Sequence, residues 1–190
     1  MKPKNFIYSK SYRIPYRGCC MHSLAELKFA ISLENEFRYL REPVIIGYDQ
    51  KTRKTTNYFR EETKQYTPDF LARSIITGIA YLVEIKPAAF RNTDVSGFYQ
   101  EIGSNYIEQH ALDWKFKIIY DDEIHLSASS LEKYKLFERN KQQFEHVFSM
   151  HKANRKYANE PIRDFSSVPS FPDDPLGKTD YVKFVKSGIL

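Results

Sequence analysis

The chain contains 190 residues, a length that suits one domain with a tail, since a domain typically has roughly 100 to 200 residues. Hydrophobic residues make up 42% of the chain and aromatic residues 15%, which excludes a globally disordered protein. No apolar stretch approaches the roughly 18 residues of a membrane-spanning helix, and the N-terminus lacks the apolar segment of a secretory leader. The two cysteines, Cys19 and Cys20, are adjacent and cannot join distant segments, which is typical of a reducing compartment. We therefore expect a cytoplasmic protein with no membrane partner.

The net charge of +5 is concentrated near the N-terminus. Residues 1–25 contain several cations and no acid, whereas the rest of the chain is balanced. The cations are Lys2, Lys4, Lys10, Arg13 and Arg17, and the aromatic residues among them are Phe6, Tyr8, Tyr12 and Tyr16. Such a mixture neutralises phosphates and stacks on bases, but it is equally typical of a segment whose rings fold back on a core. We interpret residues 1–22 as a basic aromatic arm.

The first half of the chain predicts one helix followed by three strands. Ser23 and Glu26 have the spacing of a helix-capping box, helical periodicity continues to about Leu40, and Pro43 prevents further extension. Gly78 predicts the turn between the last two strands. The predicted elements are a helix over residues 23–40, a strand over 44–48, a polar hairpin or loop over 49–64, and strands over 65–74 and 79–86.

The second half predicts a helix over residues 94–110, a strand over 114–120, and a helix from about Ser129 to a point before Ala153. Residues 151–190 are rich in proline and predict an extended tail. The order of elements predicts an α/β (α+β) fold with a mixed central sheet flanked by helices, which occupies residues 23–150 between the arm and the tail.

Two acids and a lysine lie on adjacent apolar segments. Glu84 and Lys86 are two residues apart in a predicted strand, so their side chains leave the same face, and Asp69 follows Pro68 in the preceding strand. A buried charge costs several kcal/mol in order of magnitude unless it is paired or binds a metal, so charges in an apolar strand indicate function. The pattern suggests a metal-dependent nuclease.

Each of these residues also has an ordinary structural explanation. Glu26 is explained by the capping box alone, Asp69 by a turn after proline, and Glu84 with Lys86 by an exposed ion pair worth about 0–1 kcal/mol. Their order along a helix and two neighbouring strands favours the nuclease interpretation.

The run Tyr66-Thr67-Pro68-Asp69-Phe70, followed by Glu84-Ile85-Lys86, resembles the PD-(D/E)xK nuclease superfamily, which has the restriction-endonuclease-like fold. Residues 12–126 are more narrowly similar to the catalytic domain of TnsA, the endonuclease of heteromeric transposases. This similarity rests on Ser23 and Glu26, on Glu42-Pro43-Val44, on the Tyr-Thr-Pro-Asp-Phe run, and on residues 114–124. TnsA proteins can have Gln where this chain has Glu84, and residues 127–190 do not match their partner-binding domain.

The resemblance implies that Glu26, Asp69, Glu84 and the backbone carbonyl of Ile85 surround Mg²⁺, for which Mn²⁺ substitutes. It implies that Lys86 is the catalytic lysine, which orients the attacking water or stabilises the phosphorane. It further implies a DNA endonuclease of transposition that works with a transposase subunit and its regulator. Two alternatives stay open: a phage head-completion or standalone restriction or repair nuclease, and a DNA-binding assembly module that does not cut.

Binding of the DNA backbone is expected from basic residues outside the motif. These are Lys10, Arg13 and Arg17 in the arm, and Lys51, Arg53, Lys54 and Arg60 in the polar hairpin or loop.

Overall fold

The computed structural model describes residues 12–17, 19–58 and 62–157 of the chain. The predicted tail from residue 158 on and two of the predicted DNA-binding residues, Lys10 and Arg60, lie outside these residues. The described residues form two compact units. One unit is Ser32–His125, and the other combines the described parts of Ser9–Ile31 and Leu126–Leu190. Each unit is described separately.

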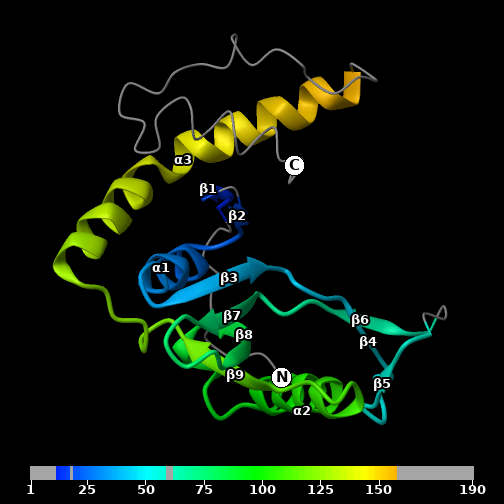
Figure 1. The fold of residues 1–190 in the computed structure, drawn as a ribbon. Coiled ribbons are helices and arrows are strands. Elements are labelled where there is room, and N and C mark those ends of the chain that lie inside the picture. The colour runs from blue at the N-terminus through cyan, green and yellow to red at the C-terminus, as the bar shows by residue number, and fades with distance from the viewer. Residues whose placement is uncertain (1–11, 18, 59–61, 158–190) are drawn as a thin grey trace. The chain divides into compact units, whose positions relative to one another are not determined.

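A mixed four-stranded sheet forms the centre of the first unit (Figure 1). Its strands are β3 (Phe37–Arg41), β7 (Phe70–Ser74), β8 (Ala80–Lys86) and β9 (Trp114–Tyr120), in that order. The pairs β3–β7 and β7–β8 are antiparallel, whereas β8 and β9 are parallel. The parallel pair requires a crossover, which consists of a short 3-10 helix, η1 (Ala88–Phe90), and helix α2 (Asp94–Gln109). The predicted mixed α and β class is thereby confirmed.

A second sheet has three short strands, β5 (Thr55–Thr56), β4 (Ile46–Tyr48) and β6 (Lys64–Tyr66), in that order and antiparallel. Its inner residues Ile46 and Tyr66 belong to one buried cluster with Leu82 of β8 and Ile102 of α2. The small sheet, the central strand and the helix thus share a core. This core holds Tyr66 close to β8.

Helix α2 packs closely against β9 because it has glycine at position 103. A Cβ atom added at Gly103 would collide with the ring of Phe116. Gly97, six residues earlier, has nothing within 4 Å of such an atom. Glycine costs about 1 kcal/mol relative to alanine inside a helix. At position 103 this cost is offset by the close approach of the helix to the strand.

The second unit contains a hairpin of β1 (Ile14–Tyr16) and β2 (Cys19–Met21), helix α1 (Leu24–Ser32), and helix α3 (Ala128–Tyr157). Helix α3 packs on β1 through Phe137, whose ring meets that of Tyr16 edge to face with the centroids 5.3 Å apart. Tyr16 is buried, so this part of the predicted arm contributes to a core. No helix in the described parts of the chain is both long and apolar enough to cross a membrane.

The helix predicted to reach about Leu40 ends at Ser32. The prediction was wrong because Leu33 and Phe37 are four residues apart and fit helical spacing. Residues 37–41 instead alternate between half-buried and exposed positions, as β3 does when it pairs with β7. The backbone N–H of Phe37 still donates to the carbonyl of Leu33, so one helical bond survives in the turn before the strand.

The strand predicted over residues 65–74 was also wrong, because it consists of two strands in different sheets. The chain leaves the small sheet after Tyr66 and enters the large one at Phe70, with Pro68 between them. Proline has no N–H for a sheet ladder, which makes it suited to this break. The strand predicted over residues 44–48 is shorter than expected and begins at Ile46.

Candidate functional site

Glu84 and Lys86 lie near the end of β8, the strand that has β7 on one side and β9 on the other. They pair with Ile118 and Tyr120 of β9, and the alternation of the strand puts both on the face that also bears Leu82. Glu84 is buried. The predicted placement of the two charges on one strand face is therefore confirmed.

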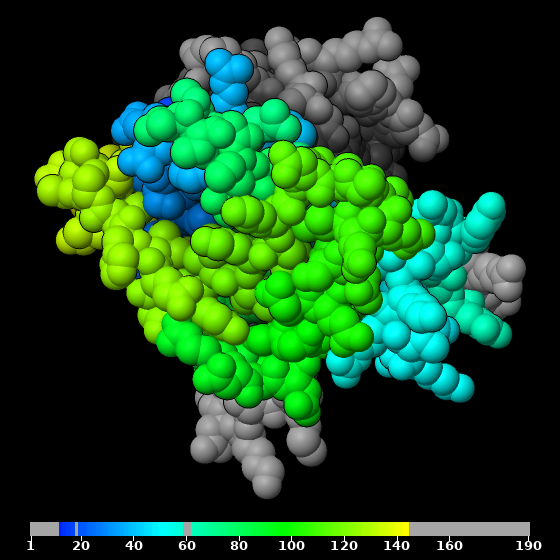
Figure 2. Space-filling model, turned by 60° about the horizontal axis from the view of Figure 1, so that its bottom comes forward, coloured from blue at the N-terminus to red at the C-terminus, as the bar shows by residue number. Residues whose placement is uncertain are grey.

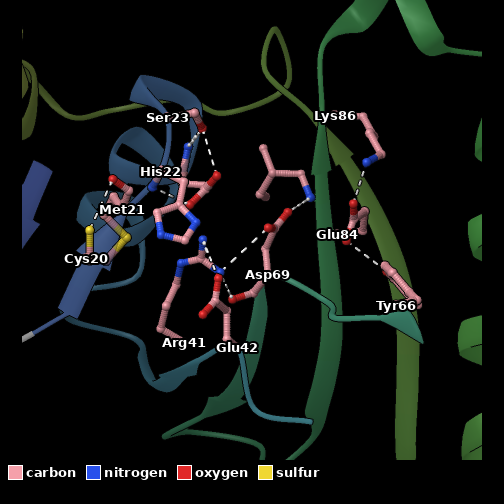
Figure 3. A network of polar contacts seen from close by, with 12 residues as sticks. Cys20, Met21, His22, Ser23, Arg41, Glu42, Tyr66, Asp69, Glu84 and Lys86 are labelled. Atoms are coloured by element: carbon pink, nitrogen blue, oxygen red, sulfur yellow. Dashed lines mark hydrogen bonds and ion pairs between the residues drawn. The ribbon is translucent and has the colours of Figure 1, made fainter. Parts of the chain in front are cut away.

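Both oxygens of the buried Glu84 carboxylate have partners, as Figure 3 shows. Lys86 Nζ lies 2.5 Å from Oε1, and the phenol of Tyr66 donates a 2.8 Å hydrogen bond to Oε2. A buried carboxylate is tolerated only when its charge is compensated in this way. The two partners also fix the orientation of the carboxylate on the strand.

Two aromatic rings, those of Tyr99 and Tyr66, lie beside the Glu84–Lys86 pair. Lys86 Nζ lies 4.1 Å from the ring centroid of Tyr99 on α2, a cation–π geometry. The rings of Tyr99 and Tyr66 lie 4.8 Å apart at an interplanar angle of 45°. Sequence reasoning assigned no role to either tyrosine. Tyr66 belonged to the recognised motif, but no local signal marks Tyr99, because α2 brings it to β8 only in the folded chain.

The charges of the cluster are mutually stabilising. Burial by itself lowers the pKa of Lys86, but its interaction with Glu84, with smaller contributions from Tyr99 and Asp69, raises that pKa overall. Burial, and then the charge of Glu84, raise the pKa of Tyr66. At neutral pH Lys86 is therefore an ammonium group and Tyr66 an uncharged phenol.

Asp69 immediately precedes β7, and its side chain is bound to β8. Asp69 Oδ2 accepts a 2.7 Å hydrogen bond from the backbone N–H of Ile85, the residue between Glu84 and Lys86. A carboxylate that accepts a backbone N–H is held in a defined orientation. The structure thus places Asp69, just before β7, beside the segment of β8 that carries Glu84 and Lys86.

Arg41, at the end of β3, holds the backbone of Asp69. Its Nη1 donates a 2.9 Å hydrogen bond to the carbonyl oxygen of Asp69 and lies 3.6 Å from the carboxylate oxygen Oδ1. The guanidinium also lies over the ring of Phe70, 5.3 Å from its centroid. Glu42 donates its N–H to the same carbonyl from a left-handed backbone conformation with φ of 49°. The sequence did not indicate a role for Arg41, because the helix was wrongly predicted to reach about Leu40 and the strand that carries Arg41 was not expected.

Glu26 lies in the other unit, where it caps α1. The hydroxyl of Ser23 donates to Glu26 Oε1 and accepts the N–H of Glu26, each at 3.1 Å, and Glu26 Oε2 accepts the N–H of His22 at 2.9 Å. The capping interaction predicted from the spacing is therefore confirmed, although the Glu26 carboxylate accepts the backbone N–H of His22 instead of that of Ser23. The metal-binding role of Glu26 stays a prediction.

The donors around β8 fit a hard divalent cation. Asp69 and Glu84 have carboxylate oxygens, the ligand type that such a cation prefers. Mg²⁺ is commonly bound through one or two carboxylates, with waters and substrate phosphates completing its octahedron. Among the residues that the structure describes, no group of three or more His, Cys, Asp or Glu side chains is placed to hold a metal. A metal held by these residues would need further oxygens from water or substrate, and the metal-binding role of Asp69, Glu84 and the Ile85 carbonyl stays a prediction.

The remaining predicted DNA-binding residues are divided between the units. Arg13 and Arg17 are exposed in the second unit, and Lys51 and Lys54 are exposed in the loop between β4 and β5. Arg53 binds within its own unit, since its Nη1 lies 2.6 Å from Glu101 and its guanidinium lies over the ring of Phe98. Binding of DNA by these residues stays a prediction.

Comparison with known proteins does not assign this chain to a family. No protein-family model and no curated protein matches this chain.

Proposed function

We propose that this protein is a metal-dependent endonuclease that hydrolyses phosphodiester bonds of DNA, as a TnsA-like member of the PD-(D/E)xK superfamily. One observation carries the proposal. Asp69 is bonded to the backbone N–H of Ile85, and the residues on either side of Ile85 are the buried, ion-paired Glu84 and Lys86. This arrangement unites the two parts of the sequence motif around a short segment of β8.

The energetics of the pair support a functional role. Removing two charges from water costs several kcal/mol per ion, and apolar residues of similar volume often stabilise a fold equally well or better. Glu84 is buried and the Lys86 side chain is only 19% exposed. A strand that needed only stability would have no reason to retain both charges. Their retention supports a requirement for chemistry.

The residues would divide the reaction as follows. Asp69, Glu84 and the carbonyl of Ile85 would hold Mg²⁺, which polarises the phosphoryl group and lowers the pKa of a bound water. Lys86 has three N–H donors and uses one on Glu84, so the others are available to a phosphate oxygen or to the attacking water. Arg41 would keep Asp69 in position through its bond to the Asp69 carbonyl.

The architecture of the first unit also supports the proposal. The resemblance implies a restriction-endonuclease-like fold with a mixed central sheet flanked by helices, and a mixed sheet with α2 as its crossover agrees with that expectation. Action in transposition with a partner transposase follows from the narrower similarity to TnsA. The same chemistry would serve a phage or repair nuclease, so the substrate must be found by experiment.

The test is cleavage by the purified full chain. Supercoiled, linear and branched DNA are incubated with wild type, Asp69→Asn, Lys86→Met and the control Asp113→Asn, an exposed acid on the approach to β9. We expect nicks or breaks in Mg²⁺ or Mn²⁺ with wild type and the control only. Cleavage by Asp69→Asn at the wild-type rate would refute the proposal. If wild type does not cut alone, calorimetric Mn²⁺ binding that Asp69→Asn abolishes would support the metal site, and equal binding by the two would refute it.

A further inference from the structure

One face of β3 and β7 carries exposed basic and apolar side chains. Arg38 pairs with Arg73, and Leu40 pairs with Leu71, so these four side chains share a face. On the opposite face β7 presents the buried residues Phe70, Ala72 and Ser74. Arg38 and Arg73 are exposed, and 61% of Leu40 is accessible to solvent. The sheet is therefore packed on one side of these strands and open on the other.

The two arginines repel each other, which lowers the stability of the chain when no ligand is bound. Directly opposite residues of an antiparallel pair have Cβ atoms about 4.5–5.5 Å apart, and like charges there are destabilising. Within the described part of the chain, neither guanidinium forms an ion pair or a hydrogen bond. An anionic group placed between them would relieve the repulsion. The placement of Arg38 opposite Arg73 therefore favours a ligand with negative charge.

The turn that follows β7 adds two exposed isoleucines. Ile75 is 57% and Ile76 83% accessible, at turn positions that are usually polar. The turn is well defined, because Gly78 adopts φ of 72° and donates its N–H to the carbonyl of Ser74. The exposed isoleucines thus lie in a turn of defined conformation. Figure 2 shows β7 and its turn, in teal, at the surface of the molecule.

These residues define the β3–β7 patch, which comprises Arg38, Leu40, Leu71, Arg73, Ile75 and Ile76. We propose that the β3–β7 patch binds an acidic segment of a partner protein that carries apolar side chains beside its carboxylates. The carboxylates bind Arg38 and Arg73, and the apolar side chains cover Leu40 and the two isoleucines. The inference is independent of the proposed cleavage activity.

The chemistry of the patch favours a protein over DNA. Guanidinium groups bind carboxylates and phosphates equally well in geometric terms, since both accept two parallel hydrogen bonds. Leu40, Ile75 and Ile76 distinguish the two, because a phosphate backbone offers no apolar surface against which they lose contact with water. Arginine beside apolar residues is typical of protein interfaces. A partner that satisfies both components must therefore be acidic and apolar.

The test uses the full chain and defined probes. Fluorescence anisotropy measures binding of a labelled peptide of alternating Asp and Leu, with Lys–Leu and Asp–Ser peptides and a DNA duplex as comparisons. The variants are Arg38→Glu, Arg73→Glu and Ile76→Ser, and the matched controls are Lys64→Glu and Lys115→Glu, which are exposed lysines outside the patch in the same unit. We expect saturable binding of the Asp–Leu peptide that each arginine variant weakens by about tenfold or more and the controls leave unchanged. Ile76→Ser weakens it as well.

Several outcomes would overturn the proposal. One is a lack of saturable binding of the Asp–Leu peptide, and another is equal binding by wild type and both arginine variants. Equal affinity for the Asp–Ser peptide would show that the apolar residues take no part. Binding of the duplex alone, lost in the arginine variants, would assign the patch to DNA. Self-association in sedimentation that the same variants abolish would assign it to a second copy. Thermal melting verifies that every variant is folded.

Discussion

Asp69 Oδ2 accepts a 2.7 Å hydrogen bond from the backbone N–H of Ile85, 16 residues later in the chain. A side chain at the start of β7 is thereby attached to the strand that carries Glu84 and Lys86. This bond allows the structural role of Asp69 to be separated from its proposed chemical role. The amide oxygen of an asparagine can accept the same hydrogen bond but carries no negative charge.

Asp69→Ala and Asp69→Asn should therefore differ in the free energy of unfolding, whereas both should lose DNA cleavage. Alanine leaves the partly buried N–H of Ile85 without its acceptor, which costs up to about 3 kcal/mol, whereas asparagine retains an acceptor and costs less. Both changes should abolish cleavage, because neither side chain carries the negative charge that holds a metal. Urea unfolding and a nicking assay measure the two effects. Equal unfolding free energies for Ala and Asn would show that the bond to Ile85 contributes no stability.

Removal of the Tyr66 hydroxyl should weaken the fold and change its alkaline unfolding. Tyr66→Phe loses a buried hydrogen bond to a charged group, which is worth about 1.5–3 kcal/mol. Burial and Glu84 raise the pKa of Tyr66 above its unfolded value, so its contribution to stability is fully present below pH 10.0 and declines above it. The wild type should therefore lose stability above about pH 10 more steeply than Tyr66→Phe does. Tyr58→Phe, at an exposed tyrosine, is the control and should change neither quantity.

The Glu84–Lys86 pair should be strongly coupled. Lys86→Met removes the ammonium group that compensates a buried carboxylate, and loss of one member of a buried pair costs about 3–5 kcal/mol. The double change Glu84→Gln with Lys86→Met removes both charges and should cost less than the two single changes together. Chemical denaturation of the four proteins gives the coupling energy. Additive single effects would mean that the ion pair does not stabilise the strand.

Two glycines of α2 should respond in opposite ways to alanine. Gly103→Ala places a Cβ against the ring of Phe116 and should destabilise by about 1–3 kcal/mol. Gly97→Ala meets no neighbour and should stabilise by up to about 1 kcal/mol through helix propensity. Thermal melting of both variants tests the contact between α2 and β9. A stable Gly103→Ala protein would show that the helix can move away from the strand without cost.

Arg38→Glu should make the isolated chain more stable. It replaces two opposite like charges by a cross-strand ion pair with Arg73, which is worth about 0.2–1 kcal/mol. The double exchange of Arg38→Glu with Arg73→Glu restores a like-charge pair and should remove the gain. Melting temperatures at low salt measure the difference, and higher salt should reduce it. A drop in stability for Arg38→Glu would indicate that the arginine serves the fold itself.

Local patterns were sufficient for part of the structure. The apolar run of residues 79–86 predicted a strand, the spacing of Glu84 and Lys86 predicted that both lie on one face, and helical spacing predicted α2. The spacing of Ser23 and Glu26 predicted the cap of α1. These features depend on neighbours within a few residues, so the sequence carries their signal directly. The same reasoning failed at residues 37–41, where helical and strand patterns overlap and pairing with β7 selects the strand.

The sequence by itself determined which acids and which lysine were candidates, because their types and order along the chain were sufficient. Only the tertiary structure decided that Tyr66, Tyr99 and Arg41 surround them. Tyr66 is 18 residues from Glu84, and Arg41 is 28 residues from Asp69. Such contacts form when sheet pairing and the packing of α2 bury apolar surface. A short sequence pattern depends only on near neighbours, so it cannot indicate a contact between residues this far apart in the chain.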